Sequence, residues 1–207
     1  MKFYNYPTQK FTLAMSTTSR LFIVFFSFLF MNFGHTNEDF VSKILNEFDL
    51  AEFESDFTIV ISVKKQKLYL LNKSEMIKEF DISTSKYGVG FESESFKTPL
   101  GLHTIKKKIG DNVPLNGVFK YRRFSGDVSI PNDPLFLDQD LITTRIMWLS
   151  GNEESNRLSY DRFIYIHGTP EELNIGKPSS HGCIRMLNTD IYALYEIVDQ
   201  GTPVIIR

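Results

Sequence analysis

Beyond residue 57 the chain is patterned as short apolar runs separated by turn residues. Thr58–Val63 and Leu68–Leu71 flank a polar turn at residues 64–66, and residues 72–74 separate the second run from Ile77–Ile82. Runs of about four to eight residues rich in aliphatic and aromatic side chains, bounded by polar turns, are typical of β-strands. Further short strands are predicted at Leu102–Ile105, Val118–Arg122, Phe163–Ile166 and Thr202–Arg207.

Two segments of the same region have helical spacing instead. Residues 38–48 place apolar side chains on one face with two acids in the first turn, and residues 189–198 also place apolar side chains on one face. The apolar positions are Phe40, Val41, Ile44, Leu45 and Phe48 in the first segment and Ile191, Leu194, Tyr195 and Val198 in the second. Many short strands with one or two short helices predict a mostly β fold, a β-sandwich or barrel. We expect a short helical lead-in at residues 37–57 and a single domain at residues 58–207.

The N-terminal segment has a different character. Eleven of the thirteen residues at 21–33 are apolar, and the run follows Arg20 and a Ser/Thr-rich stretch. A basic region followed by an apolar run of this length is typical of an export signal, and it is shorter than a usual membrane-spanning helix. We therefore predict that residues 1–36 are a signal peptide, with Met1 or Met15 as the start, or a membrane anchor that tethers the protein through residues 21–33. A buried core helix is the remaining alternative.

Charge and composition narrow the classes of function. The 207 residues carry a net charge of −2, and the first 36 contain three basic residues and no acidic one, so the rest of the chain is more acidic still. An acidic body disfavours nucleic-acid binding. An apolar content of 42% disfavours a disordered chain, and a single cysteine excludes an intrachain disulfide framework. The basic clusters at residues 106–108 and 122–123 are expected to be solvated strand faces.

The chemistry-bearing residues gather between residues 166 and 188. The lone Cys183 follows His181 and Gly182, and His167 ends a predicted strand sixteen positions before Cys183. Cysteine chemistry uses a thiolate, and an imidazole within hydrogen-bond reach can generate it by taking the proton. Such a neighbour would lower the pKa of the thiol. Two alternatives remain from the residues alone. Cys183 could fill a gap in the core, or His167, His181 and Cys183 could be three ligands of a zinc ion.

Several motifs in this chain resemble one known family. His167-Gly-Thr and the segment Ser180-His-Gly-Cys-Ile-Arg-Met-Leu-Asn188 are similar to the signature of the L,D-transpeptidase (YkuD-type) catalytic domain. Residues 65–70 resemble the first hairpin of that family, and residues 82–85 with residues 97–101 resemble another of its segments, with Ser85 where glycine is usual. The final Gly-Thr-Pro-Val also fits, so the resemblance covers residues 58–207.

The resemblance implies a role for each matching residue. Cys183 would be the nucleophile, His167 would accept and donate the proton, and the backbone carbonyl of Gly168 would orient the imidazole. Backbone N–H groups near Gly182 and Cys183 would bind the oxyanion.

The resemblance places four further residues around the nucleophile. Ser180 and His181 would line the site, and Arg185 would hold either the loop or a substrate carboxylate. Asn188 would pin the loop and cap a helix beginning at Thr189.

The implied reaction is peptidoglycan cross-linking in the periplasm or cell envelope. A tetrapeptide stem would acylate the cysteine with release of D-alanine, and an acceptor amine would resolve the thioester. The same site could act as an L,D-carboxypeptidase or attach a lipoprotein to the wall, and a non-catalytic wall-binding module is a further alternative. No cofactor, metal or nucleic-acid partner is expected, and the oligomeric state is left open.

Overall fold

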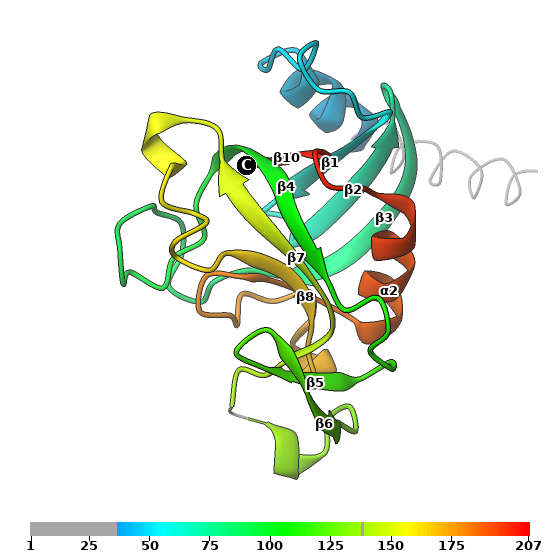
Figure 1. Cartoon of the computed structure of the whole chain (residues 1–207). Helices are drawn as coiled ribbons and strands as arrows, with labels where there is room; N and C mark the ends of the chain where they lie inside the picture. Colours follow the sequence, from blue (N-terminus) through cyan, green and yellow to red (C-terminus); the bar gives the residue numbers. More distant parts are fainter. Residues whose placement is uncertain (1–36, 138) are drawn as a thin grey trace, which may run out of the picture. The chain divides into compact units, whose positions relative to one another are not determined.

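We describe a computed structural model of residues 37–137 and 139–207 (Figure 1). The predicted signal peptide or anchor at residues 1–36 lies outside the described residues. Within the described part, no helix is both long and apolar enough to cross a membrane. Residues 37–45 are helical, slightly shorter than the predicted 38–48, and Val41–Arg207 form one compact unit.

Besides the helix at residues 37–45, the described residues form ten strands, the α-helix α2 and three short 3-10 helices. The strands are β1 (Phe57–Ser62), β2 (Lys67–Asn72), β3 (Glu75–Ser83), β4 (Gly101–Ile109), β5 (Gly117–Lys120), β6 (Arg123–Val128), β7 (Ile142–Gly151), β8 (Tyr165–Gly168), β9 (Ile184–Met186) and β10 (Pro203–Ile206). The helices are η1 (Pro134–Phe136), η2 (Glu154–Asn156), η3 (Glu172–Asn174) and α2 (Asn188–Ile197).

Eight of the strands close into a barrel. Their order is β4-β10-β1-β2-β3-β9-β8-β7, and β7 pairs again with β4 to complete the ring. The pairs β1–β10 and β8–β9 are parallel and the others are antiparallel. The hairpin β5–β6 continues from β7 outside the ring, at the lower end of Figure 1. The predicted mostly β barrel with short helices is confirmed.

The strand β7, which the sequence analysis did not predict, is central to this arrangement. It pairs with β8, β4 and β5, and it is buried over most of its length. Its register shifts between Thr143 and Ile146, where Thr144 has a φ of 66°. The bulge and burial on both faces remove the alternation that marks a half-buried strand, and a buried arginine, Arg145, interrupts the apolar run.

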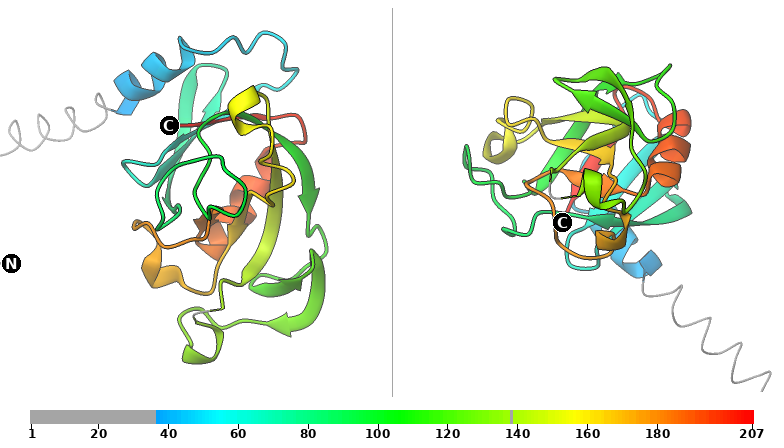
Figure 2. Two further views of the ribbon diagram at one scale, coloured as in Figure 1. Left: turned by 90° about the vertical axis from the view of Figure 1, so that its left-hand side faces the viewer. Right: turned by 90° about the horizontal axis from the view of Figure 1, so that it is seen from below.

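The barrel interior and α2 share one apolar core. The predicted face of α2, with Ile191, Leu194, Tyr195 and Val198, is buried in the same cluster as inward side chains of eight strands. This helix lies alongside β7 and β8 (Figure 2). It begins at Asn188, one residue earlier than predicted.

Two predicted strands have different bounds in the structure. Val118–Arg122 is interrupted at Tyr121 and Arg122, which have φ values of 52° and 64° and form the tight turn of the β5–β6 hairpin. Both central residues of such a turn need a positive φ. The strand expected from Phe163 begins only at Tyr165, because Phe163 also has a positive φ of 59°.

The C-terminal end of α2 receives a charged donor from β4. Lys108 Nζ donates to the carbonyls of Tyr195 and Val198 at 2.7 and 2.6 Å. A cation at this end satisfies carbonyls that the helix leaves free and complements its dipole. The expectation that residues 106–108 form a solvated face is therefore wrong for Lys108, although Lys106 is exposed.

We predict that Lys108→Met lowers the free energy of unfolding by about 1–2 kcal/mol, because two charge-assisted hydrogen bonds are lost. Urea unfolding would measure it. The matched control is Lys106→Met on the same strand, which should change stability by less than about 0.5 kcal/mol. Equal effects of the two variants would contradict the capping role.

Candidate active site

The parallel pairing of β8 with β9 brings the predicted catalytic residues to one face. His167 lies opposite Arg185 in the register, and the neighbouring Ile166 and Ile184 point into the core. Because side chains alternate along a strand, His167 and Arg185 point to the outer face of the barrel. Cys183, two residues before Arg185, packs against an outer cluster that includes Tyr165. Strand register therefore places His167 and Cys183 on the same outer face, with Cys183 just before β9 and two residues from the residue opposite His167.

The imidazole of His167 is buried and held by the chain itself. Its Nδ1 lies 2.8 Å from the carbonyl oxygen of Gly168, which can only accept, so Nδ1 carries the proton and Nε2 is left as the acceptor. Burial lowers the pKa of His167 to about 4, against the opposing effects of Asp140 and of the Gly168 hydrogen bond. The ring is therefore neutral near pH 7, in a tautomer that can accept a proton at Nε2.

The thiol of Cys183 is also neutral in this structure. Burial raises the pKa of Cys183 to about 12, although a hydrogen bond from the Tyr165 backbone opposes the shift. Sγ donates to the carbonyl of Phe163 at 3.3 Å. The lowered thiol pKa expected from sequence is therefore wrong for this structure. The environment disfavours both the thiolate and the imidazolium, so the pair rests uncharged.

A tight turn shapes the backbone in front of Cys183. The Ser180 hydroxyl accepts from the Gly182 N–H at 3.2 Å and donates to the Cys183 carbonyl at 2.6 Å. Gly182 has a φ of 119°, which disfavours any other residue, and its carbonyl accepts from the Thr98 hydroxyl at 3.0 Å. The Gly182 N–H, one of the expected oxyanion donors, is thus bonded to Ser180 in this structure.

A buried ion cluster lies behind the turn. The guanidinium of Arg185 is almost fully buried; its Nε and Nη2 donate to Asp140 Oδ1, and its Nη1 donates to Glu171 Oε2 at 3.2 Å and to the Ser179 hydroxyl at 3.3 Å. His181 Nδ1 lies 2.6 Å from Asp140 Oδ2. Of the two roles left open for Arg185, these contacts support holding the loop.

The sequence analysis missed Asp140 and Glu171. Burial would raise the pKa of Asp140, but the charge and hydrogen bonds of Arg185 outweigh it and lower that pKa. A signal was present, because an arginine within the apolar run Ile184-Arg-Met186 needs carboxylate partners when it is buried. Nothing in the pattern indicates which carboxylates these are.

Asn188 pins the segment that follows His167. Its Oδ1 accepts from the hydroxyls of Thr143 and Thr144, both at 2.6 Å, and its Nδ2 donates to the carbonyl of Thr169 at 2.8 Å. The expected helix cap is wrong, because Leu187 is the N-cap residue and Asn188 is already helical. A Cβ on Gly168 would lie 2.6 Å from Asn188 Oδ1, so the carbonyl that orients His167 requires glycine here.

A cavity of about 320 Å³ is lined in part by Phe163, whose carbonyl accepts the Cys183 thiol, although Cys183 and His167 are not in its wall. Its walls include Phe163 and Ile164, which follow one another before β8, and His181 from the turn. The ring of His181 packs near Tyr87 and Phe96, with centroids 5.7 and 5.8 Å away. In the described ranges, no group of three or more His, Cys, Asp or Glu side chains could hold a metal ion, so His167, His181 and Cys183 do not form the alternative zinc site.

An arginine from the hairpin reaches the same face. The guanidinium carbon of Arg122 lies 5.1 Å from the ring centroids of both Trp148 and Phe163. Its charge opposes the raised pKa of Tyr165, which burial brings to about 12. The expectation of a merely solvated face is therefore wrong for Arg122, which a positive-φ turn holds over aromatic rings beside Cys183.

The comparisons with known proteins agree with the sequence motifs. The YkuD family model, described as the L,D-transpeptidase catalytic domain, matches residues 56–206. Two proteins of Bacillus subtilis (strain 168) provisionally assigned as L,D-transpeptidases, YkuD and YqjB, are 54% identical over 42 residues and 44% identical over 45 residues. These matches cover 20% and 22% of this chain and 26% of each relative, so the matched segment spans about a quarter of their length.

Two solved structures are similar to this chain at lower identity. An L,D-transpeptidase from Xylanimonas cellulosilytica is 18% identical with a TM-score of 0.49, over 75% of this chain and 62% of that one. One from Mycobacterium smegmatis is 19% identical with a TM-score of 0.46, over 73% and 58% of the two chains.

We predict that alkylation of folded Cys183 by iodoacetamide accelerates continuously as pH rises past about 8.5, the value of a free thiol. The reason is the raised pKa of the thiol, which keeps the thiolate scarce at neutral pH. Mass spectrometry of quenched samples would give the rates. The same chain in urea is the control and should show an inflection near that of a free thiol. A rate plateau below pH 7 in the folded protein would contradict the neutral pair.

We predict that Asp140→Asn lowers the free energy of unfolding by about 3 kcal/mol at pH 7, since it leaves Arg185 buried with one carboxylate fewer. The pKa of Asp140 is lowered by folding, so its contribution is present at neutral pH and lost as pH falls through the folded value. Urea unfolding between pH 7 and 3 should show the difference narrowing.

The matched control is Asp81→Asn, because Asp81 pairs with Lys67 at 2.9 Å on the surface. An exposed pair contributes only about 0–1 kcal/mol, so this variant should stay close to wild type. A pH-independent gap for Asp140→Asn would refute the assigned role of its charge.

Proposed function

Because the chain belongs to the YkuD family of L,D-transpeptidase catalytic domains, we propose that it is a peptidoglycan L,D-transpeptidase. The observation that carries the proposal is that His167 on β8 and Cys183, just before β9, share the outer face of the barrel, with Nδ1 of His167 bonded to the Gly168 carbonyl. A cavity lined by Phe163, whose carbonyl accepts the Cys183 thiol, lies close by. Members of this family act on peptidoglycan stem peptides. Such a substrate requires a location outside the cytoplasm, and export through residues 1–36 would supply it.

The first half of the proposed reaction forms a thioester. Cys183 Sγ attacks the carbonyl of the third stem residue, at the L-centre of diaminopimelate, while His167 Nε2 takes the thiol proton. Backbone N–H groups at Gly182 and Cys183 stabilise the oxyanion, which requires Gly182 to exchange its bond with Ser180. The C–N bond then breaks, and the imidazolium of His167 returns the proton to the amine of the departing D-alanine.

The second half reverses these roles. The acceptor amine attacks the thioester carbonyl, His167 Nε2 accepts the amine proton, and the C–S bond breaks to release the Cys183 thiolate. That thiolate recovers the proton from His167, so atoms and charges balance over the cycle. Because the resting pair is neutral, the proton moves only as a substrate is attacked, and the thiol stays less reactive between turnovers.

A nearby cation supports a substrate that carries carboxylates. Arg122 stands over Phe163, whose carbonyl accepts the Cys183 thiol, and no ion pair engages its guanidinium in the described ranges. A tetrapeptide stem presents a terminal carboxylate and a side-chain carboxylate near the bond to be broken. We infer that Arg122 binds one of them, and that Arg185, committed to Asp140 and Glu171, does not.

The same site could instead hydrolyse the thioester. Water as the acceptor would make the protein an L,D-carboxypeptidase, and the amine of a lipoprotein would make it an attachment enzyme. These alternatives share every step up to the thioester. A non-catalytic wall-binding module would use none of them, and the paired His167 and Cys183 favour catalysis over it.

We predict that the purified protein releases D-alanine from tetrapeptide muropeptides and forms cross-linked dimers, separated by chromatography and identified by mass. Cys183→Ala should abolish release, because no other cysteine is present, and cost stability only about 1 kcal/mol. Tripeptides without dimers would identify a carboxypeptidase. Binding without any release would leave only the wall-binding alternative.

A carbapenem provides the control for the nucleophile. Its strained amide should acylate Cys183, and the tethered amine cannot leave, so intact-protein mass should rise by one drug molecule. Cys183→Ala should show no adduct, and Lys106→Met should label like wild type. An adduct that persists in Cys183→Ala would overturn the assignment of the nucleophile.

A further inference from the structure

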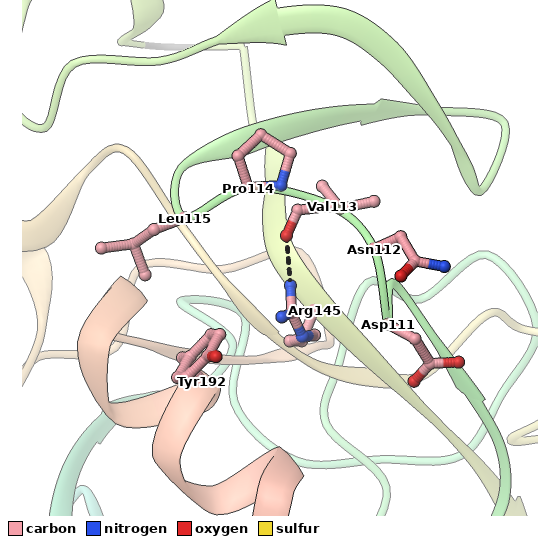
Figure 3. A pocket seen from close by; sticks show the side chains of 7 residues that line it. All are labelled: Asp111, Asn112, Val113, Pro114, Leu115, Arg145 and Tyr192. Carbon is pink, nitrogen blue, oxygen red and sulfur yellow. Dashed lines mark hydrogen bonds between the residues drawn. The ribbon is translucent and has the colours of Figure 1, made fainter.

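A second cavity, of about 530 Å³, lies between α2 and the segment that joins β4 to β5. Figure 3 shows its walls: Asp111, Asn112, Val113, Pro114 and Leu115 from that segment, Arg145 from β7 and Tyr192 from α2. None of these residues lines the cavity at Phe163. The pocket is therefore separate from the candidate active site.

The floor of this pocket is a buried guanidinium. Arg145 is 3% exposed, and its Nη1 donates to the carbonyl of Val113 at 2.7 Å (Figure 3). The same Nη1 also donates to the carbonyl of Thr144 at 2.7 Å. Its Nε is buried without a partner, and its Nη2 makes no hydrogen bond to any described residue. Arginine stays protonated in proteins, so the buried Nε–H of this cation, and the two N–H groups of Nη2, have no acceptor among the described residues.

Arg185 and Arg145 are both buried, but only Arg185 has a carboxylate partner among the described residues. Arg185, equally buried, turns the edge formed by its Nε and Nη2 toward Asp140, which supplies the counter-charge. The same edge of Arg145 has no hydrogen-bond partner among the described residues, and no carboxylate of these residues lies within 4.0 Å of it. That edge is the one that binds a carboxylate with two parallel hydrogen bonds. A buried charge without a counter-ion is costly, so the site is built for an anionic group from outside the chain.

The other residues that line the pocket narrow the class of ligand that it could bind. Tyr192 supports the guanidinium from one side, with its ring centroid 4.7 Å from the Arg145 guanidinium carbon. Asp111, also in the lining, accepts the Tyr195 hydroxyl at 2.7 Å through Oδ1 and has Oδ2 free of hydrogen bonds to described residues. One cation and one carboxylate in the same pocket match a zwitterion better than a phosphate. Val113, Pro114 and Leu115 add an apolar wall for a small side chain.

We propose that this pocket binds a small amino-acid zwitterion. The carboxylate lies on the Nε and Nη2 edge of Arg145, and the ammonium group faces Asp111. The site does not depend on the proposed transpeptidase activity, and it adds a ligand-binding function to the opposite side of β7.

The test is an NMR titration of the full chain with alanine, following the Nε–Hε signal of Arg145. We expect a saturable shift with D- or L-alanine, a weaker one with acetate, and none with ethylamine. Asp111→Asn should weaken alanine binding several-fold and leave acetate binding unchanged. Arg145→Lys keeps the charge but loses the two parallel N–H donors of the guanidinium edge. It should therefore weaken alanine binding at least tenfold, as measured from the shifts of the Tyr192 ring signals. A non-saturating shift, or equal binding by Arg145→Lys, would overturn the proposal.

A second pair of variants covers the case in which Arg145→Lys does not fold. Leu115 is 41% exposed on the rim, so Leu115→Glu places a tethered carboxylate at the pocket without touching Arg145. This variant should abolish alanine binding and raise Tm, whereas the neutral Leu115→Gln should retain binding with an unchanged Tm. If both variants bind alanine equally and melt at the same temperature, Arg145 needs no external anion and the proposal fails.

Discussion

The geometry of the candidate site depends on one buried ion pair, between Arg185 and Asp140. Arg185 lies on β9, the short strand that carries the chain out of the turn at residues 180–183, and it is opposite His167 in the register. By holding Asp140 and Glu171 it connects β9 to the segments before β7 and after β8. Parallel strands cannot be joined by a tight turn, so the connection from His167 to Cys183 must cross over and return. Through its bonds to Asp140 and Glu171, Arg185 fixes the position at which this crossover segment returns to the sheet.

The electrostatics follow from the same burial. The burial that strengthens the ion pairs of Arg185 also removes water from around His167 and Cys183. It therefore favours the neutral forms of both side chains. A site that rests neutral is stable without substrate, because it stores no unpaired charge. The positional precision comes from backbone groups instead: the Gly168 carbonyl for the imidazole and the Phe163 carbonyl for the thiol. Both positions depend on local backbone that few other sequences would adopt.

The sequence was sufficient for most of the barrel strands, and it pointed to the motif residues, whose catalytic roles stay predictions. The hairpin of β1 and β2, strand β3 and the apolar face of α2 follow from local patterns, because each buries one face and turns through polar residues. Strand β7 did not follow, since it is buried on both sides and bulged at Thr144. Asp140 and Arg122 were also missed as site residues. Their positions depend on turns with positive φ and on contacts across 45 and 26 positions with Arg185 and Trp148, which no local pattern records.

The closure of the barrel has a consequence for the order of folding. Strand β10 lies between β4 and β1, where Ile59 is opposite Val204, so the first strand and the last one pair directly. The ring therefore cannot close during synthesis until the end of β10 has left the ribosome. Pairing across such a sequence separation is slow because of its loop entropy. Export in an unfolded state, which belongs to the proposed function, would benefit from this delay, since the topology keeps the chain open until its last strand is free to pair.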